Sequence, residues 1–144
     1  MAVMNEESIA KAGKIINEKA GKGMEAYCVL ALIDDDGYPT ASTLSIAKAG
    51  GINWITFGTG LDSNKANRIK NSNKASVCIT SASYNITLVG TAEVLTDLET
   101  KKDMWYEGME YHFTGPDDPS YCVIRFKTIR YNIMVGEDEV SGNL

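Results

Sequence analysis

The chain has 144 residues, which is the length of one domain rather than two. With 44% hydrophobic and 23% charged residues, it has the composition of an ordinary globular protein, which excludes a disordered or fibrous chain. Fourteen basic and nineteen acidic residues give a net charge of −5. This balance argues against sequence-independent binding to nucleic acid or to an anionic membrane surface, because both need a net basic surface.

Several absences point to a cytoplasmic protein without a metal centre. The longest apolar run, residues 27–33, is too short to span a bilayer, and the chain opens with neither a basic segment nor an apolar signal core. Cys28, Cys78 and Cys122 are scattered within apolar stretches, which is typical of buried reduced thiols rather than of disulfides or a zinc site. The single histidine, His112, ends an apolar helical face, so we expect a packed side chain rather than a catalytic group or a metal ligand.

The periodicity of apolar residues predicts a mixture of helices and strands. Helical spacing predicts a first helix over residues 5–20, with Asn5 as its N-cap. An Asp-Gly pair at residues 36–37 then predicts a tight hairpin between two strand-like runs. Strands are expected at residues 27–33, 38–46, 52–57, 75–80, 84–95 and 121–131, and further helices at residues 63–72 and 97–112.

These elements predict a mainly β protein. Six strands joined mostly by short turns favour an antiparallel sheet that closes into a small barrel, with the three helices packed outside it. We expect a single domain over residues 1–144, with the barrel at about 27–134 and a frayed polar tail at 136–144.

The segment that follows the third strand is the most informative part of the chain. Gly58 and Gly60 allow a tight turn, Thr59 and Ser63 offer hydroxyl groups, and Lys65 enters in the first turn of the next helix. Unpaired N–H groups at a helix start favour an anion, and a bound phosphate would offset the unfavourable placement of a lysine there. The plainer alternative is that Ser63 or Asp62 caps the helix and that Lys65 is a solvated surface residue.

Two other features have a functional and a structural interpretation. Trp105 and Tyr106 could stack on a planar cofactor, but aromatic residues at helical spacing more often belong to a core or an interface. The acidic run at residues 34–36 is most simply a solvated hairpin tip, because the spacing of a calcium-binding EF-hand loop is absent.

Five stretches then occur in the order and spacing of a known family. They are Gly-Tyr-Pro-Thr-Ala-Ser-Thr-Leu-Ser at 37–45, Trp-Ile-Thr-Phe-Gly-Thr followed by Ser-Asn-Lys within 54–65, the helix and strand of 66–77, the long strand of 85–94, and the segments 103–105 and 115–119. Through these stretches the chain resembles the pyridoxamine 5′-phosphate oxidase-like split-barrel flavoproteins, and within them the general stress protein 26-like branch. The resemblance covers about residues 27–131.

The resemblance implies a six-stranded FMN-binding split barrel that forms a homodimer, with the cofactor in a cleft between the subunits. Thr59, Ser63 and Lys65 would hold the FMN phosphate, with Asn64 in the place of the arginine of the family's Ser-Arg-Lys motif. Gly58 would lie close to the cofactor.

The remaining residues implied by the resemblance belong to two strands. Ser42, Thr43 and Leu44, in the strand segment that ends at Ser45, would line the ribityl chain and the isoalloxazine ring. Asn85 would take the position of a glutamine that meets the flavin.

The departures from the family pattern matter for substrate. Ser42 and Asn64 stand where the family has arginines, Asn132 stands where it has a tryptophan, and the C-terminal Arg-Leu-His-x-Arg segment of the true oxidases is absent. A clamp for the phosphate of a pyridoxine substrate is therefore missing, and this argues against a true pyridoxamine phosphate oxidase.

The functional expectation is an FMN-dependent oxidoreductase, in which the flavin carries the redox chemistry and no catalytic residue can be assigned. Alternatives are a flavin-sequestering stress protein without turnover, a nitroimidazole-reductase-like enzyme, and a split barrel that binds haem or a deazaflavin. Haem needs an axial ligand, for which a single histidine on an outer helix is poorly suited.

Overall fold

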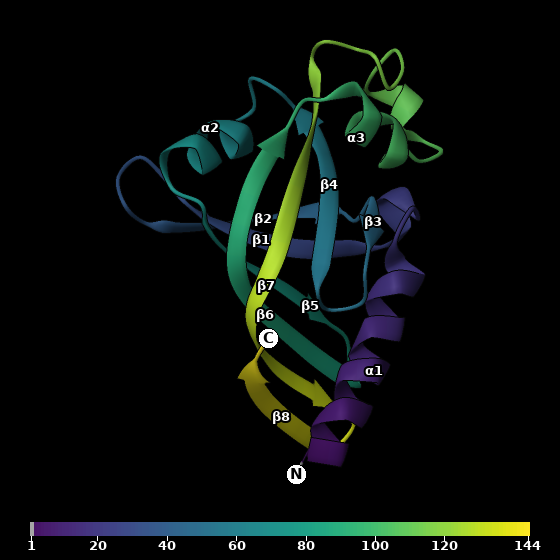
Figure 1. Ribbon diagram of the computed structural model, residues 1–144, viewed down its shortest axis with the longest axis vertical. Helices are drawn as coiled ribbons and strands as arrows, with labels where there is room; N and C mark the ends of the chain where they lie inside the picture. The colour runs from purple at the N-terminus through teal and green to yellow at the C-terminus, as the bar shows by residue number, and fades with distance from the viewer. Residues whose placement is uncertain (1) are drawn as a thin grey trace.

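The computed structural model describes residues 2–144 and shows one antiparallel sheet, curled into a half-barrel and flanked by helices (Figure 1). The strands are β1 (Tyr27–Ile33), β2 (Pro39–Ser45), β3 (Lys48–Ala49), β4 (Trp54–Gly60), β5 (Lys74–Thr80), β6 (Tyr84–Leu95), β7 (Tyr121–Val135) and β8 (Asp138–Asn143). The helices are α1 (Ala2–Lys19), α2 (Asn64–Asn71) and α3 (Leu98–Asp103), with short 3₁₀ turns at Gly23–Glu25 and Met109–Tyr111.

The sheet has the strand order β2-β1-β5-β6-β7-β4-β3, and β8 pairs with the end of β7. The long strands β6 and β7 run through most of the molecule, so that their two ends lie in different parts of it (Figure 1). The first half of β7 pairs with β4, and its second half pairs with β8. Helix α1 packs on β7 and β8, whereas α2 packs on β6 and β1.

Alternation along each strand builds the main core inside the curl. Cys28, Leu30 and Leu32 of β1 are buried, and the residues between them are half-buried on the outer face. Ile55 and Phe57 of β4 face the same interior, and Ile16 of α1 belongs to the same hydrophobic cluster. Each such side chain contributes about 1.5–3 kcal/mol when it is fully buried, so this cluster is the dominant stabilising feature.

A β-bulge between Val89 and Gly90 changes the phase of the β6–β7 ladder. Phe126 faces the core before the bulge and Tyr131 faces it after the bulge, although the two positions differ by an odd number and would lie on opposite faces of a regular strand. Ile129 lies at the irregularity and is 53% exposed. A Cβ atom at Gly90 would lie 1.8 Å from the carbonyl oxygen of Lys127, so the two backbones meet at a distance that only glycine allows.

A second, smaller cluster covers the outer face of β4 and β7. Tyr121 and Val123 of β7 are buried there with Met109, and Trp105 packs edge-on against Tyr121 with ring centroids 5.4 Å apart. The start of β7 is therefore buried on both faces, and four consecutive residues from Tyr121 to Ile124 are inaccessible to solvent. The structural interpretation of Trp105 as a packed aromatic residue fits this arrangement.

The structure confirms a mainly β fold with flanking helices and corrects several details of the prediction. The sheet has eight strands rather than six. One additional strand, β3, is only two residues long and gave no pattern in the sequence, and the other, β8, is formed by residues 138–143, which were expected to be a frayed tail. The first helix begins at Ala2, so Asn5 is not its N-cap; the Asn5 amide instead donates to the Tyr131 hydroxyl at 3.3 Å.

The segment predicted as one helix over residues 97–112 also differs. Helix α3 ends at Asp103, and Gly108 with φ +109° separates it from the 3₁₀ turn at Met109–Tyr111. His112 follows that turn and is exposed, so the prediction that it packs on an apolar helical face is wrong. Gly108 breaks the helical phase on which that prediction rested. Within residues 2–144, no helix combines the length and apolar character needed to cross a membrane.

Candidate functional site: the corner between β4 and α2

The turn from β4 into α2 brings together the hydroxyl groups that the sequence singled out. We call residues 57–65 the β4–α2 corner. Ser63 is the N-cap of α2, and its hydroxyl accepts a hydrogen bond from the Ala66 N–H at 3.2 Å. The Thr59 hydroxyl donates to the same oxygen at 3.2 Å. The two hydroxyl groups therefore lie side by side at the start of the helix, where main-chain N–H groups lack intrahelical acceptors.

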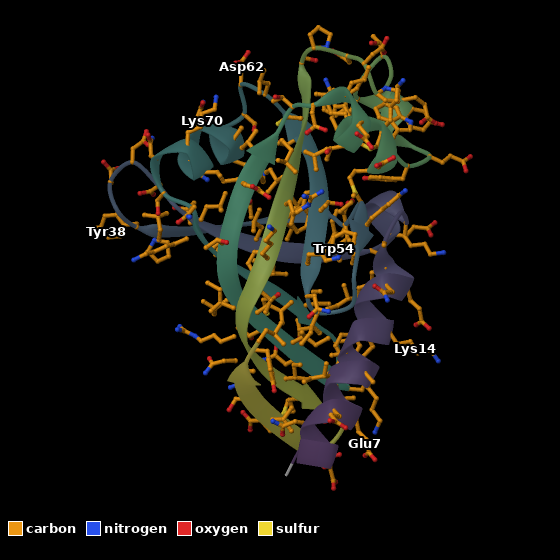
Figure 2. The ribbon with its side chains drawn as sticks, viewed as in Figure 1. Glu7, Lys14, Tyr38, Trp54, Asp62 and Lys70 are labelled. Atoms are coloured by element: carbon orange, nitrogen blue, oxygen red, sulfur yellow. The ribbon has the colours of Figure 1, made fainter. Side chains whose placement is uncertain are left out.

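Lys65 lies in the first turn of α2 and is half-buried, while its neighbour Asn64 is exposed. Asn64 and Arg68 line a hollow of about 290 Å³ together with the acidic hairpin tip at residues 34–36. Asn71, on the same face of α2, donates to the Asp35 carboxylate at 3.1 Å. This face of the helix is thus turned to carboxylates. Lys65, in the first turn of α2, does not line the hollow. Figure 2 labels Asp62 just before this helix and Lys70 near its end.

Strand β2 presents its predicted residues alternately to the two faces of the sheet. Ser42 lies opposite Leu30, and Leu44 lies opposite Cys28, so Ser42 and Leu44 are on the interior side, where both are half-buried. Thr43 is exposed on the outer face. The hydroxyl of Ser45 is already engaged, because it donates to the Gly23 carbonyl oxygen at 2.8 Å.

The end of β2 leads directly to β4. After Ser45 the chain turns so that the Ala47 N–H donates to the Thr56 carbonyl oxygen at 2.8 Å, and the Lys48 N–H donates to the Thr56 hydroxyl at 3.1 Å. Gly58 and Thr59 follow Thr56 on β4. The chain that leaves β2 is therefore hydrogen-bonded to β4 two residues before Gly58, although β2 and β4 are not paired in the sheet.

Gly58 has a packing role in this structure. A Cβ atom there would lie 2.3 Å from the terminal methyl group of Met109, so the glycine leaves room for the methionine that covers the outer face of β4. The sequence alone did not indicate this contact, because Met109 follows a turn whose direction no local pattern predicts. Only the main chain of Gly58 remains to approach a ligand.

Asn85 is far from the corner within one chain. It lies at the start of β6, opposite Met134 near the end of β7, and is exposed. The corner lies at the other end of β7, where Gly60 pairs with Tyr121. Thirteen residues of strand correspond to about 40 Å, so a single copy does not bring Asn85 to the corner. It does lie near the predicted segment of β2, because its side chain contacts Cys78, which is opposite Val29, and Val29 is opposite Thr43.

Burial raises the pKa values of several phenols and thiols near the corner and in the barrel. Burial raises the pKa of Tyr121 to about 12, and it also raises the pKa of Cys122. The pKa of Tyr106 is raised by burial and partly lowered again by a hydrogen bond with Ser45. In the barrel, burial raises the pKa of Cys28 to about 12. These phenols and thiols remain neutral at pH 7, so none of them is a ready nucleophile or base.

The comparison with family models decides the relationship of the chain. A model described as pyridoxamine 5′-phosphate oxidase matches residues 19–134. The chain belongs to this family. A comparison with curated protein sequences gives no significant match.

Members of the pyridoxamine 5′-phosphate oxidase family and related folds also appear among similar solved structures. A Clostridium acetobutylicum protein related to general stress protein 26 of B. subtilis is 21% identical over 96% of both chains, with a TM-score of 0.81. A pyridoxamine 5′-phosphate oxidase-related, FMN binding protein from Nostoc punctiforme is 15% identical, with a TM-score of 0.65 and 96% and 93% coverage of the two chains. A heme binding protein from Mycobacterium smegmatis is 19% identical over 94% of this chain and 57% of that one, with a TM-score of 0.70. These likenesses confirm the split-barrel fold.

Proposed function

We propose that the chain is an FMN-binding protein that acts as an FMN-dependent oxidoreductase of the general stress protein type. The observation that carries the proposal is the β4–α2 corner, where two hydroxyl groups, a helix start and a half-buried lysine meet. This is the donor set that a phosphate dianion requires. Membership of the pyridoxamine 5′-phosphate oxidase family and an FMN binding neighbour of the same fold support this choice of ligand.

The residues present fit a flavin mononucleotide in chemical terms. Thr59, Ser63 and Lys65 would hold the phosphate, and the α2 main chain would add N–H donors. Ser42, Thr43 and Leu44 would border the ribityl chain and the ring, and Gly58 would offer its main chain. Asn64 is turned toward the acidic hairpin, so it would add little to phosphate binding.

The flavin would supply electron or hydride transfer, and the protein would supply position and electrostatics. The neutral phenols and thiols around the corner neither attack a substrate nor compete for protons at pH 7. The Tyr106 hydroxyl, which stays protonated and is hydrogen-bonded to Ser45, would lie beside the end of β2. We therefore assign no acid or base to this chain.

Homodimerisation belongs to the same proposal. Asn85 lies about 40 Å of strand away from the corner of its own chain, and we propose that it meets the flavin of that corner from a second copy. We propose a cleft shared between two subunits of a cytoplasmic protein, in which one subunit provides the corner and its partner provides Asn85. Light scattering should then give twice the mass of the chain, and a monomer that binds FMN tightly would contradict the shared cleft.

The departures from the oxidase pattern support a different substrate. Ser42, Asn64 and Asn132 replace two arginines and a tryptophan of the pattern, and Asn132 is exposed on β7. A second phosphate therefore lacks a basic clamp, and we propose that pyridoxamine 5′-phosphate is not oxidised. A nitroimidazole-reductase-like activity is an alternative within the same chemistry, and turnover of a nitroimidazole would reveal it.

Haem is an alternative ligand, because one protein of similar fold, from Mycobacterium smegmatis, is a heme binding protein. His112 is exposed after the 3₁₀ turn at Met109–Tyr111, outside the barrel, and this placement gives little support to axial ligation. A Soret band in protein titrated with haemin, lost in His112→Ala, would favour the haem alternative over FMN.

The test of the proposal is a titration of the protein with FMN, followed by flavin fluorescence. We expect Lys65→Ala to weaken binding by about 1–3 kcal/mol, because it removes a charge-assisted hydrogen bond. Lys70→Ala, which removes a charge from the last turn of the same helix, is the matched control and should bind FMN as the unmodified protein does. Equal affinities for both variants would refute the phosphate assignment.

A second measurement separates an oxidoreductase from a flavin-sequestering protein. The FMN-loaded protein is mixed with NADH or NADPH under anaerobic conditions, and the flavin absorbance is followed. Bleaching supports an oxidoreductase. If no donor or acceptor changes the redox state while FMN remains bound, the sequestering function is the better description.

A further inference from the structure

A cavity on the outer face of β4 and β7 lies apart from the residues assigned to FMN. Its volume is about 460 Å³, within the range of small-molecule sites, and it is lined by Asn53, Trp54, Met104, Arg125, Lys127, Thr128 and Leu144. We call it the Trp54 cavity. None of these residues belongs to the β4–α2 corner or to the predicted segment of β2.

The strand register brings the aromatic and cationic walls together. Trp54 of β4 lies directly opposite Lys127 of β7, and Arg125 is two residues along the same strand, so all three side chains are on one face. Figure 2 shows Trp54 on β4, between that strand and α1. The Cβ atoms of opposite neighbours on paired strands are about 5 Å apart, so the side chains of Trp54 and Lys127 leave the sheet next to each other.

The indole ring is held in place from one side. A Cβ atom at Gly50 would lie 2.2 Å from the Trp54 Nε1 atom, so the edge of the indole ring rests against the main chain of the β3–β4 turn. The Gly50 N–H also donates to the Trp54 carbonyl oxygen at 3.0 Å. The residue is therefore fixed before a ligand arrives, which lowers the entropic cost of binding.

The two cations of the cavity are only loosely paired. The Arg125 guanidinium and the Lys127 ammonium both lie 3.9 Å from the same Glu93 oxygen, at the long end of the ion-pair range. Two cations therefore share one adjacent carboxylate, and neither forms a short ion pair with it. The side chain of Arg125 is only 29% exposed, so its charge is less screened by solvent than that of a free surface residue.

We propose that the Trp54 cavity binds an aromatic carboxylate, with its ring against Trp54 and Met104 and its anionic group against Arg125 and Lys127. An aromatic face suits a planar ligand, and two loosely paired cations suit a carboxylate. The proposal does not depend on FMN, because the lining residues and the corner are separate sets.

The test is equilibrium dialysis of the full-length protein against 2-naphthoate, with the neutral 2-naphthamide as a comparison, in the presence and absence of saturating FMN. We expect naphthoate to bind at least about tenfold more tightly than naphthamide, as a charge-assisted contact would give. We expect FMN to leave this affinity unchanged. Equal affinity for the two probes, absence of naphthoate binding, or its displacement by FMN would each overturn the proposal.

Substitutions of the positive and of the negative residues should change the naphthoate affinity in opposite directions, which a merely structural role would not produce. Lys127→Met should weaken naphthoate binding about tenfold, whereas Glu93→Gln should strengthen it severalfold, because it removes the carboxylate that both cations share. Arg130→Met, an exposed position on the same strand outside the cavity, is the control and should change nothing. Equal effects of the Lys127 and Arg130 substitutions, or weaker binding to Glu93→Gln, would overturn the assignment.

Discussion

The β4–α2 corner and the Trp54 cavity are two places where this fold could receive an anion, and they are built differently. In the corner, the hydroxyl groups of Thr59 and Ser63 and the cation of Lys65 all come from seven consecutive residues. In the cavity, Trp54 and Lys127 are far apart in the chain and meet only through the β4–β7 ladder. A site made of local segments depends on a helix cap, whereas a site made across strands depends on the register of the sheet.

The largest effect is expected from a substitution that disturbs that register. Gly90→Ala places a Cβ atom 1.8 Å from the Lys127 carbonyl oxygen, so the two backbones must separate, and the protein should lose about 3 kcal/mol or more of stability. Gly60→Ala is the matched control, because its Cβ atom would have only ordinary contacts, the nearest at 3.9 Å. Urea unfolding of both variants measures the difference, and equal midpoints would show that the close approach at the bulge does not matter.

The next largest effect concerns the loop behind the corner. Lys101 is buried, and its ammonium group donates to the Asp118 carbonyl oxygen at 2.8 Å; the neighbouring Ser120 carbonyl oxygen accepts from the Leu61 N–H of the corner. Lys101→Met removes the charged one of two donors to this oxygen, which also accepts from the Tyr121 N–H at 3.1 Å, and should cost about 1–3 kcal/mol in the free energy of unfolding. Lys102→Met, at the exposed neighbouring position, should cost much less in the same experiment. Similar losses in both would mean that this contact is not what stabilises the loop.

Two helix caps provide a sharper test of the corner. Ser63 caps α2 and Asp97 caps α3, each by accepting a main-chain hydrogen bond. Replacing either residue by alanine should lower stability by about 1 kcal/mol. Only Ser63→Ala should also weaken FMN binding in a titration, because only that hydroxyl group lies in the proposed phosphate site. Weaker FMN binding by both variants would indicate a general loss of stability rather than a lost phosphate contact.

The smallest effect is a pH dependence in the exposed loop before β7. The Asp118 carboxylate accepts hydrogen bonds from the Thr114 N–H and from the Ser120 hydroxyl and N–H, and these lower its pKa to about 2. A lowered folded-state pKa adds stability above the unfolded value of about 3.9, and this contribution is lost as the pH falls toward 2.

The urea midpoint of the unmodified protein should therefore fall between pH 4 and pH 2 by more than that of Asp118→Asn. Asp117→Asn, at the neighbouring exposed position, should keep the slope of the unmodified protein. The same slope in all three proteins would remove Asp118 as the source of this pH dependence.

Much of the fold could be predicted from the sequence. Alternation gave the bounds of β1, β5 and β6 to within one residue, and the Asp-Gly pair correctly indicated the β1–β2 hairpin. The residues of the corner were also found in advance, and the cap of α2 is Ser63, one of the two candidates named. The roles of Ser42, Thr43, Leu44, Asn85 and the other predicted flavin contacts stay predictions.

Residues that depend on long-range packing were missed. The sequence assigned no role to Arg125 and Lys127, since alternation along a strand gives the face of a residue but not its neighbour across the ladder. Met109 and His112 were placed on a helix that Gly108 interrupts, and β8 was expected to be frayed because its residues are polar.

The sequence by itself determined the features that depend on short stretches of chain: the strand periods, the tight hairpin, the capped helix α2 and the family motif that spans them. These follow from side-chain alternation and from hydrogen bonds within a few residues. Only the tertiary structure decided the phase change at Gly90, the pairing of Trp54 with Lys127 and the separation of Asn85 from the corner. Those features depend on hydrogen bonds between segments distant in the chain, and no local pattern specifies which strands will meet.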